Sequence, residues 1–212
     1  MLGDVLLITE KHERAADTIL EYIPKEKNSK FIIAISGESG SGKTELAHVI
    51  AKRLKKLGIV AKPMHIDNYY KVLPLERTEW RKKHGVSEAV GLNEYDWDTI
   101  YRNIDDFKND RISHMPCVDL VTEQVDELIT NFKGIDMLII DGLYAIKTEN
   151  ANLRVFITLT YHETKKAQVV RGKEPQNEFR MQVLEKEHQV VQSLKPMADL
   201  LVENEYNVKE RE

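Results

Sequence analysis

One segment of the chain has the glycine spacing of a loop that binds phosphate. Residues 37–44 read Gly-Glu-Ser-Gly-Ser-Gly-Lys-Thr and match the pattern Gly-x4-Gly-Lys-Ser/Thr. Glycines let the backbone turn tightly and aim successive N–H groups at phosphate oxygens. In this pattern Lys43 reaches the β- and γ-phosphates, and the Thr44 hydroxyl binds Mg²⁺. The residues expected at the nucleotide are Gly37, Glu38, Ser39, Gly40, Ser41, Gly42, Lys43 and Thr44.

The alternative for this segment is a flexible Gly- and Ser-rich connection that binds nothing. The flanking sequence favours the phosphate loop, because an apolar run precedes it at 31–35 and apolar residues at helical spacing follow it. The pattern Asn-Lys-x-Asp, which GTPases use for guanine, does not occur. A short chain with one phosphate loop and a polar insertion is typical of a small-molecule kinase, which needs a carboxylate near the acceptor hydroxyl.

Two aspartates stand where that carboxylate and a metal ligand are expected. Asp67 directly follows the predicted strand 59–66, and Asp141 closes the predicted strand 137–140. In parallel α/β sheets ligands gather at the carboxyl ends of the strands, the edge at which the phosphate loop also lies. We therefore expect Asp67 to be catalytic and Asp141 to hold Mg²⁺ together with Thr44. The alternatives are a helix N-cap for Asp67 and a turn aspartate for Asp141.

Alternating apolar runs and amphipathic segments predict an α/β fold with a parallel sheet. The strands are expected at 31–35, 59–66, 137–140, 155–159 and 200–202, and the helices at 3–23, 43–57, 75–83, 98–108 and 178–194. With the phosphate loop, this order predicts a P-loop NTPase fold, a three-layer sandwich in which helices flank a central parallel β-sheet. Pro63 indicates that the second strand lies at an edge or bends. His65, in the same strand, is expected to be packed rather than catalytic.

Composition limits the classes of protein to which the chain can belong. Its 212 residues predict one domain, 1–212, with an insertion around 68–114. Lys plus Arg number 31 and Asp plus Glu 35, a net charge of −4 that excludes a strongly basic nucleic-acid coat. The single cysteine, Cys117, suits a reducing compartment. Neither a targeting signal nor a membrane span is recognised, so the cytoplasm is expected, with no nucleic acid or membrane as partner.

Five segments outside the loop have counterparts in a known enzyme family. They are Asp-Asn-Tyr-Tyr-Lys-Val-Leu at 67–73, Tyr-Asp-Trp-Asp at 95–98, Pro-Cys-Val-Asp-Leu at 116–120, Asp-Gly-Leu at 141–143 and Ala-Asp-Leu-Leu-Val at 198–202. Together with the loop they resemble the uridine kinase and phosphoribulokinase family of P-loop kinases, over residues 31–202. There the corresponding segments read Asp-x-Phe-Tyr, Phe-Asp-His-Pro, Pro-x-Tyr-Asp-Phe, Glu-Gly-Ile and Ala-Asp followed by aliphatic residues.

The resemblance implies roles for individual residues. The aspartate of the family's Asp-x-Phe-Tyr segment is catalytic, which implies that role for Asp67 and puts Tyr70 beside the substrate. Asp96 matches an aspartate that binds the ribose. Asp119 is the second candidate for sugar hydroxyls, because paired carboxylates suit a diol.

The segment 162–180 corresponds to the family's lid, which closes over the triphosphate with several arginines. Arg171 and Lys173 flank Gly172 in a predicted turn and are expected at the nucleotide, and Arg180 is expected at the substrate. The alternative is an ordinary solvated surface, where most Lys and Arg residues lie.

Two positions depart from the uridine kinase pattern. A tyrosine and a histidine that contact the base in those enzymes fall at Val118 and Glu123 here. A pocket without them would recognise uracil poorly. An anionic acceptor would instead need basic residues in the insertion, and four cluster there: Arg77, Arg81, Lys82 and Lys83.

Three hypotheses follow. The first is an ATP- and Mg²⁺-dependent kinase of a small-molecule hydroxyl, most simply the 5′-hydroxyl of uridine or cytidine. The second keeps the chemistry but changes the acceptor to a sugar phosphate or a pantothenate-like alcohol. The third is a nucleotide-binding regulator that has lost catalysis. The choice of ATP over GTP and a homo-oligomeric state stay open.

Overall fold

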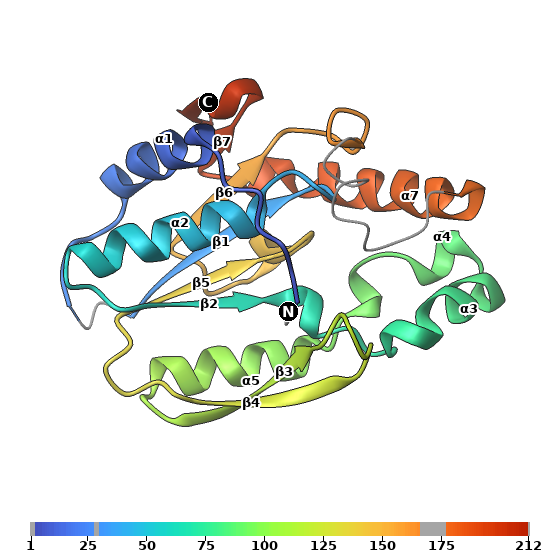
Figure 1. Ribbon diagram of the computed structural model, residues 1–212, viewed down its shortest axis with the longest axis horizontal. Helices are drawn as coiled ribbons and strands as arrows, with labels where there is room; N and C mark the ends of the chain where they lie inside the picture. Colours follow the sequence, from blue (N-terminus) through green and yellow to red (C-terminus); the bar gives the residue numbers. More distant parts are fainter. Residues whose placement is uncertain (1–2, 28–29, 166–176, 212) are drawn as a thin grey trace.

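A six-stranded sheet with helices on both faces forms the centre of the molecule (Figure 1). The computed structural model describes residues 3–27, 30–165 and 177–211. The strand order is β2-β5-β1-β6-β7-β8; the first five strands are parallel and β8 runs antiparallel to β7. This arrangement confirms the predicted three-layer α/β fold, with an antiparallel strand added at one edge.

The predicted strands and helices occur in the predicted order, with three further strands in the described ranges. The strands are β1 (Phe31–Gly37), β2 (Ala61–His65), β3 (Ile112–Val118), β4 (Val125–Asn131), β5 (Met137–Asp141), β6 (Leu153–Ile157), β7 (Leu200–Val202) and β8 (Val208–Glu210). The described α-helices are α1 (Glu10–Ile19), α2 (Lys43–Lys56), α3 (Pro74–His84), α4 (Val86–Ala89), α5 (Trp97–Lys108) and α7 (Glu178–Leu194). Short 3₁₀ turns are η1 (Leu20–Tyr22), η2 (Ile66–Asn68), η3 (Leu92–Glu94), η4 (Ala145–Lys147), η5 (Lys195–Met197) and η6 (Asn204–Tyr206).

Strand β1 shows how one apolar run serves two cores. Successive side chains of a strand point to opposite faces. Ile33 and Ile35 therefore pack with α1 and α2 on one face, whereas Ile32 and Ala34 pack with α5 and α7 on the other. Because all four are fully buried, the run contains no polar position, and both layers of helices are fixed to the same strand.

Pro63 lies in an edge strand, as predicted. Strand β2 is the first in the sheet and pairs only with β5 within it. The missing N–H of a proline does no damage on the free side of an edge strand.

The helix predicted over 3–23 is shorter than expected. It covers Glu10–Ile19, and Thr9 caps it through a capping box with His12. Val5 is 63% exposed and Ile8 39%, so these apolar residues do not belong to a buried helix face. The Thr9 cap therefore determines where the helix begins, and the loose apolar spacing before it does not indicate helix.

The antiparallel hairpin of β3 and β4 was not predicted. Most residues of β4 are exposed, so the alternation of apolar and polar residues that marks a half-buried strand is weak there. The hairpin lies beside α5 and extends the chain between β2 and β5 beyond the predicted insertion (Figure 1). Strand β8, three residues long, was also missed.

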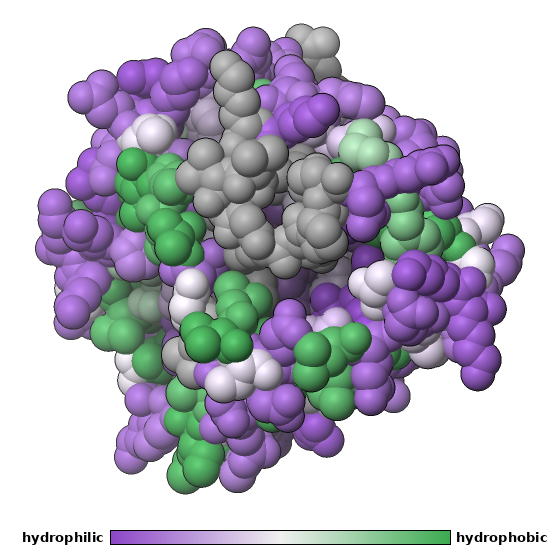
Figure 2. Space-filling model, turned by 45° about the vertical axis from the view of Figure 1, so that its right-hand side comes forward, coloured by the Kyte–Doolittle hydropathy of each residue, from purple (hydrophilic) through white to green (hydrophobic). Residues whose placement is uncertain are grey.

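The surface is polar on the face that Figure 2 shows, with hydrophobic side chains in separate groups. None of the helices in the described ranges is long and apolar enough to cross a membrane.

Candidate active site

The phosphate loop joins the carboxyl end of β1 to the first turn of α2, as predicted. Gly42, the N-cap of α2, has φ +88°, a left-handed conformation that glycine adopts without strain. At Gly37 close packing requires a glycine, because a Cβ would lie 2.7 Å from Ser41 Oγ and 2.9 Å from the carbonyl oxygen of Ile157. Both glycines are therefore needed for the shape of the loop.

Two polar side chains inside the loop suit an anion. Ser41 is fully buried, and its Oγ has no hydrogen-bond partner among the described residues. Lys43 is 7% exposed, and its Nζ donates to the carbonyl oxygen of Glu38 at 2.8 Å. A buried hydroxyl without a partner is costly, and a phosphate oxygen would satisfy it. The residues of the loop thus fit the phosphates of a nucleotide.

The carboxylate of Glu38 contacts α7 and the chain after β6. It accepts hydrogen bonds from the backbone N–H of Tyr161 and from His188 Nδ1, both at 2.7 Å, and from Gln192 Nε2 at 2.5 Å. Glu38 is only 2% exposed. A side chain predicted at the nucleotide therefore links the loop to the next layer of the structure.

Thr44 and Asp141 meet beside the loop. Because β1 pairs with β5, Asp141 lies at the same sheet edge, and Thr44 Oγ1 donates to its Oδ2 at 2.8 Å. No group of three or more His, Cys, Asp or Glu suited to a metal occurs in the described ranges. Mg²⁺ needs only one or two protein oxygens when phosphates and waters complete its shell, so this pair fits the ion.

His65 also reaches this point, although it was expected to be only packed. Strand β2 pairs with β5 so that His65 stands opposite Asp141, and its Nδ1 contacts Asp141 Oδ1. The charge of Asp141 raises the pKa of His65, although burial opposes the shift. Burial alone would raise the pKa of Asp141, but His65 and the hydrogen bond from Thr44 outweigh it and lower that pKa. Only the pairing of two strands distant in sequence reveals this contact.

Asp67 lies in η2, directly after β2, and is partly exposed. A Cβ on Gly142 would lie 3.3 Å from Asp67 Oδ1, so the carboxylate stands against the residue that follows Asp141. Tyr95 Oη lies 3.3 Å from Asp67 Oδ1 and 2.7 Å from Tyr70 Oη. Burial raises the pKa of both tyrosines, so their hydroxyls stay protonated beside the carboxylate.

Asp96 and Asp119 lie on segments that contact this region, but each carboxylate has a local partner. Asp96 is the N-cap of α5 and accepts from Thr99 N at 3.1 Å and Thr99 Oγ1 at 2.6 Å. Asp119 accepts from Val121 N at 2.8 Å within its own turn. Their contact with a sugar stays a prediction, in which these local hydrogen bonds would have to be shared.

The ring of Tyr70 faces two arginines of α3, Arg77 and Arg81. The Arg77 guanidinium is 3.6 Å from the centre of the Tyr70 ring. Arg81 is buried and paired with Glu94 at 2.7 Å and with Glu187 of α7 at 3.6 Å. The buried ion pairs of Arg81 therefore join the insertion to α7.

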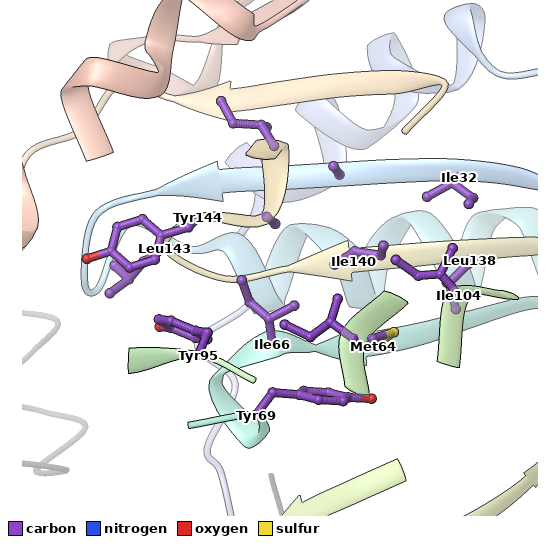
Figure 3. Packing of buried hydrophobic residues seen from close by; sticks show 14 of the residues in the cluster. Ile32, Met64, Ile66, Tyr69, Tyr95, Ile104, Leu138, Ile140, Leu143 and Tyr144 are labelled. Carbon is purple, nitrogen blue, oxygen red and sulfur yellow. The ribbon is translucent and has the colours of Figure 1, made fainter. Parts of the chain in front are cut away.

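Tyr144 adds a second aromatic ring beside Tyr95, with the ring centres 5.4 Å apart and the planes nearly perpendicular. Figure 3 shows the two rings near the carboxyl end of β5, beyond Ile140. Tyr144 is fully buried, and its hydroxyl has no hydrogen-bond partner among the residues that the structure describes. Neither ring was singled out from the sequence, because only their position in space distinguishes them from core aromatics.

The predicted lid is described only at its two ends. Thr164 Oγ1 donates to the carbonyl oxygen of Ser39 at 2.7 Å, so the first end lies against the phosphate loop. At the other end Arg180 lies 3.4 Å from the buried Glu187, seven positions along α7. Arg171 and Lys173 lie outside the described residues.

The fold and the loop define the class of protein: an α/β protein with a phosphate loop at the carboxyl edge of a parallel sheet. The sequence model of the Phosphoribulokinase / Uridine kinase family matches residues 32–163, which is more than half of the chain. The chain belongs to that family.

Individual relatives agree with this assignment. A uridine kinase of Macrococcus caseolyticus (strain JCSC5402) is 30% identical over 123 residues, 58% of this chain and 56% of that protein. The match thus spans a little over half the length of this curated relative. A solved structure titled a possible uridine kinase from Bacillus stearothermophilus has a TM-score of 0.61 at 19% identity, covering 91% of this chain and 97% of that one. Phosphoribulokinase from Rhodobacter spheroides has a TM-score of 0.62 at 11% identity, covering 83% and 70%. At these identities the two structures support the fold alone.

Proposed function

We propose that the chain is an ATP- and Mg²⁺-dependent kinase that phosphorylates the 5′-hydroxyl of a nucleoside such as uridine or cytidine. One observation carries the proposal: the phosphate loop, the hydrogen-bonded pair Thr44–Asp141 and the carboxylate of Asp67 lie at one edge of the sheet. The uridine kinase relative supports the choice of acceptor. ATP and a small molecule are the proposed partners, in a cytoplasmic setting.

On the nucleotide side, backbone N–H groups of 37–44 would hold the phosphates. Lys43 Nζ would exchange the carbonyl oxygen of Glu38 for phosphate oxygens. Thr44 and Asp141 would hold Mg²⁺, which when bound neutralises charge on the β- and γ-phosphates. Arg171 and Lys173 of the lid are proposed to add positive charge there.

On the acceptor side, Asp67 would orient the attacking hydroxyl and accept its proton as the new O–P bond forms. Tyr95 holds this carboxylate through its contact with Asp67 Oδ1. Tyr70, Asp96, Asp119 and Arg180 remain the proposed substrate contacts, and the insertion around 68–114 would form most of the acceptor pocket.

A second candidate acceptor is an anion such as a sugar phosphate. Valine and glutamate at 118 and 123 offer neither the ring nor the imidazole that contacts the base in uridine kinases. Val118 is buried, and Glu123 is exposed between β3 and β4. Arg77 stacks on Tyr70, and its Nε is buried without a hydrogen-bond partner in the described part of the chain. An anionic group beside Tyr70 would satisfy that donor.

The deciding experiment measures ADP release from Mg·ATP with nucleosides, sugar phosphates and pantothenate as acceptors. Stimulation by uridine or cytidine supports the first proposal, and stimulation by a sugar phosphate that is lost in Arg77→Gln supports the second. ATP binding with no stimulation by any acceptor contradicts both and favours a catalytically silent regulator.

The role of Asp67 is tested with Asp67→Asn. We expect turnover to fall by about 10²–10⁴-fold, because a general base contributes that much, while ADP binding stays unchanged. Asp98→Asn, an exposed aspartate on α5, is the matched control and should keep full activity. Full activity in Asp67→Asn would exclude Asp67 as the base.

A further inference from the structure

The outer side of the phosphate loop is contacted by two elements far from it in sequence. The hydroxyl of Tyr206, at the end of η6, donates to the carbonyl oxygen of Ser41. The ring of His12, in α1, lies beside the Tyr206 ring with the centres 4.5 Å apart and the planes at 60°. These contacts join α1 and the β7–β8 turn to the last residues of the loop before α2.

The fit at this contact leaves no space for a side chain. A Cβ on Gly42 would lie 2.0 Å from Tyr206 Oη and 2.6 Å from His12 Nε2. Position 42 therefore needs a glycine for two reasons: its φ is left-handed, and these two side chains approach it closely.

The turn that carries Tyr206 has an unusual backbone. Glu205 and Tyr206 are consecutive non-glycine residues with φ of +60° and +61°. Side-chain crowding disfavours this region for L-residues, so it persists where the surroundings hold it. Here the pairing of β7 with β8 closes the turn, and Lys11 of α1 makes an ion pair with Glu205 at 2.6 Å.

The geometry of the Ser41–Gly42 peptide explains how the hydrogen bond from Tyr206 can affect the loop. The structure contains no cis peptide among the described residues, so the Ser41 C=O and the Gly42 N–H point in opposite directions. A donor fixed on the outward carbonyl therefore fixes the N–H on the inner side of the loop. Hydrogen bonding to the carbonyl also strengthens that N–H as a donor.

We propose that Tyr206 is a positioning residue for nucleotide binding: its hydroxyl holds the Ser41–Gly42 peptide so that the Gly42 N–H faces the phosphates. This inference rests on the nucleotide site of the proposed function and adds to it a residue 165 positions from Ser41. Tyr206 touches the loop from outside and does not itself take part in phosphoryl transfer.

The test compares Tyr206→Phe with the wild type. Removing one hydrogen bond is expected to raise the Kd for ADP and the KM for ATP about five-fold, while kcat and the KM for the acceptor stay unchanged. Phenylalanine keeps the ring contact with His12, so the unfolding temperature without nucleotide should change little. Tyr22→Phe is the matched control, because Tyr22 is 40% exposed in the turn that follows α1 and should leave every parameter unchanged.

The outcomes separate this inference from the function on which it rests. A wild-type protein that binds no ADP overturns the proposed nucleotide site and this inference with it. A wild-type protein that binds ADP, with Tyr206→Phe binding it equally well, overturns only the role of Tyr206. An equal loss in kcat, both KM values and thermal stability also overturns it, because the residue would then act only on the fold.

Discussion

The proposed nucleotide side and the proposed acceptor side of the site are built in different ways. The phosphate loop of the nucleotide side is one run of eight residues, from the last residue of β1 to the first turn of α2. The acceptor side is assembled from separate segments: Tyr95 contacts Asp67 across 28 positions, and Asn68 Oδ1 accepts from Val118 N across 50. One side is a local backbone structure, and the other is a set of tertiary contacts.

The difference teaches where such an enzyme can change. Phosphates are bound by backbone N–H groups, which do not depend on side-chain identity as long as the glycines remain. An acceptor is recognised by side chains, and segments such as the β3–β4 hairpin can alter without disturbing the loop. The departures at Val118 and Glu123 fall on the proposed acceptor side.

The comparison predicts that variants on the two sides affect different parameters. Among the four variants that follow, the largest effect is expected for Lys43→Ala. Its charge should act on the transferring phosphoryl group, so kcat/KM should fall by about 10²–10³-fold. ADP release with the best acceptor measures this loss. Lys52→Ala, an exposed lysine on the same helix, should keep wild-type activity. A similar loss in both variants would mean that Lys43 has no special role.

Asp141→Asn is expected to act on the metal. The amide oxygen can still accept from Thr44, but the negative charge beside Thr44 and His65 is lost. We expect the Mg²⁺ requirement to rise about 10–100-fold, the range seen when groups that support a metal are changed. Titrating activity with Mg²⁺ in the wild type and the variant measures it. An unchanged titration curve would remove Asp141 from the metal site.

Asn103→Ala tests the acceptor side. Asn103 is 1% exposed; it accepts from Tyr69 Oη at 2.8 Å and donates to Ser113 Oγ at 2.7 Å. The variant leaves buried partners unsatisfied, so it should lose about 1–3 kcal/mol of stability. Because Asn103 ties β3 to the segment of Asp67, the KM for the acceptor should rise while the Kd for ADP does not.

Denaturant unfolding and the two binding parameters measure this prediction. Asn109→Ala, an exposed residue just after α5, is the control and should change stability by less than about 0.5 kcal/mol. A weaker affinity for ADP in Asn103→Ala would show that the two sides are not separate.

Glu38→Gln is expected to have the smallest effect on activity, because it changes the junction between the loop and α7. One carboxylate oxygen of Glu38 accepts from Tyr161 N, and the other accepts from His188 and Gln192. In the glutamine variant the amide NH₂ would replace one of these oxygens and would face a donor. We expect the free energy of unfolding to fall by about 1–3 kcal/mol. The KM for ATP should rise modestly, and the KM for the acceptor should not change. Thermal unfolding and steady-state kinetics measure both, with Glu178→Gln as an exposed control on α7. Unchanged stability would show that the network around Glu38 is weak.

Much of the fold could be predicted because its signals are local. The buried runs of β1 and β5, the loop between β1 and α2, and the edge position of Pro63 follow from neighbouring residues. The β3–β4 hairpin could not be predicted, because its exposed strand lacks apolar periodicity. The helix predicted from residue 3 begins at Glu10, since the Thr9 cap outweighs the loose apolar spacing before it.

The sequence by itself determined the phosphate loop, the α/β order and the candidate carboxylates at the strand ends, because each depends on residues adjacent in the chain. Only the tertiary structure decided which distant side chains join them: His65 opposite Asp141, Tyr95 against Asp67, and Tyr206 on the carbonyl of Ser41. The physical reason is that these contacts depend on strand pairing and on the packing of separate layers, which no local pattern of residue types encodes.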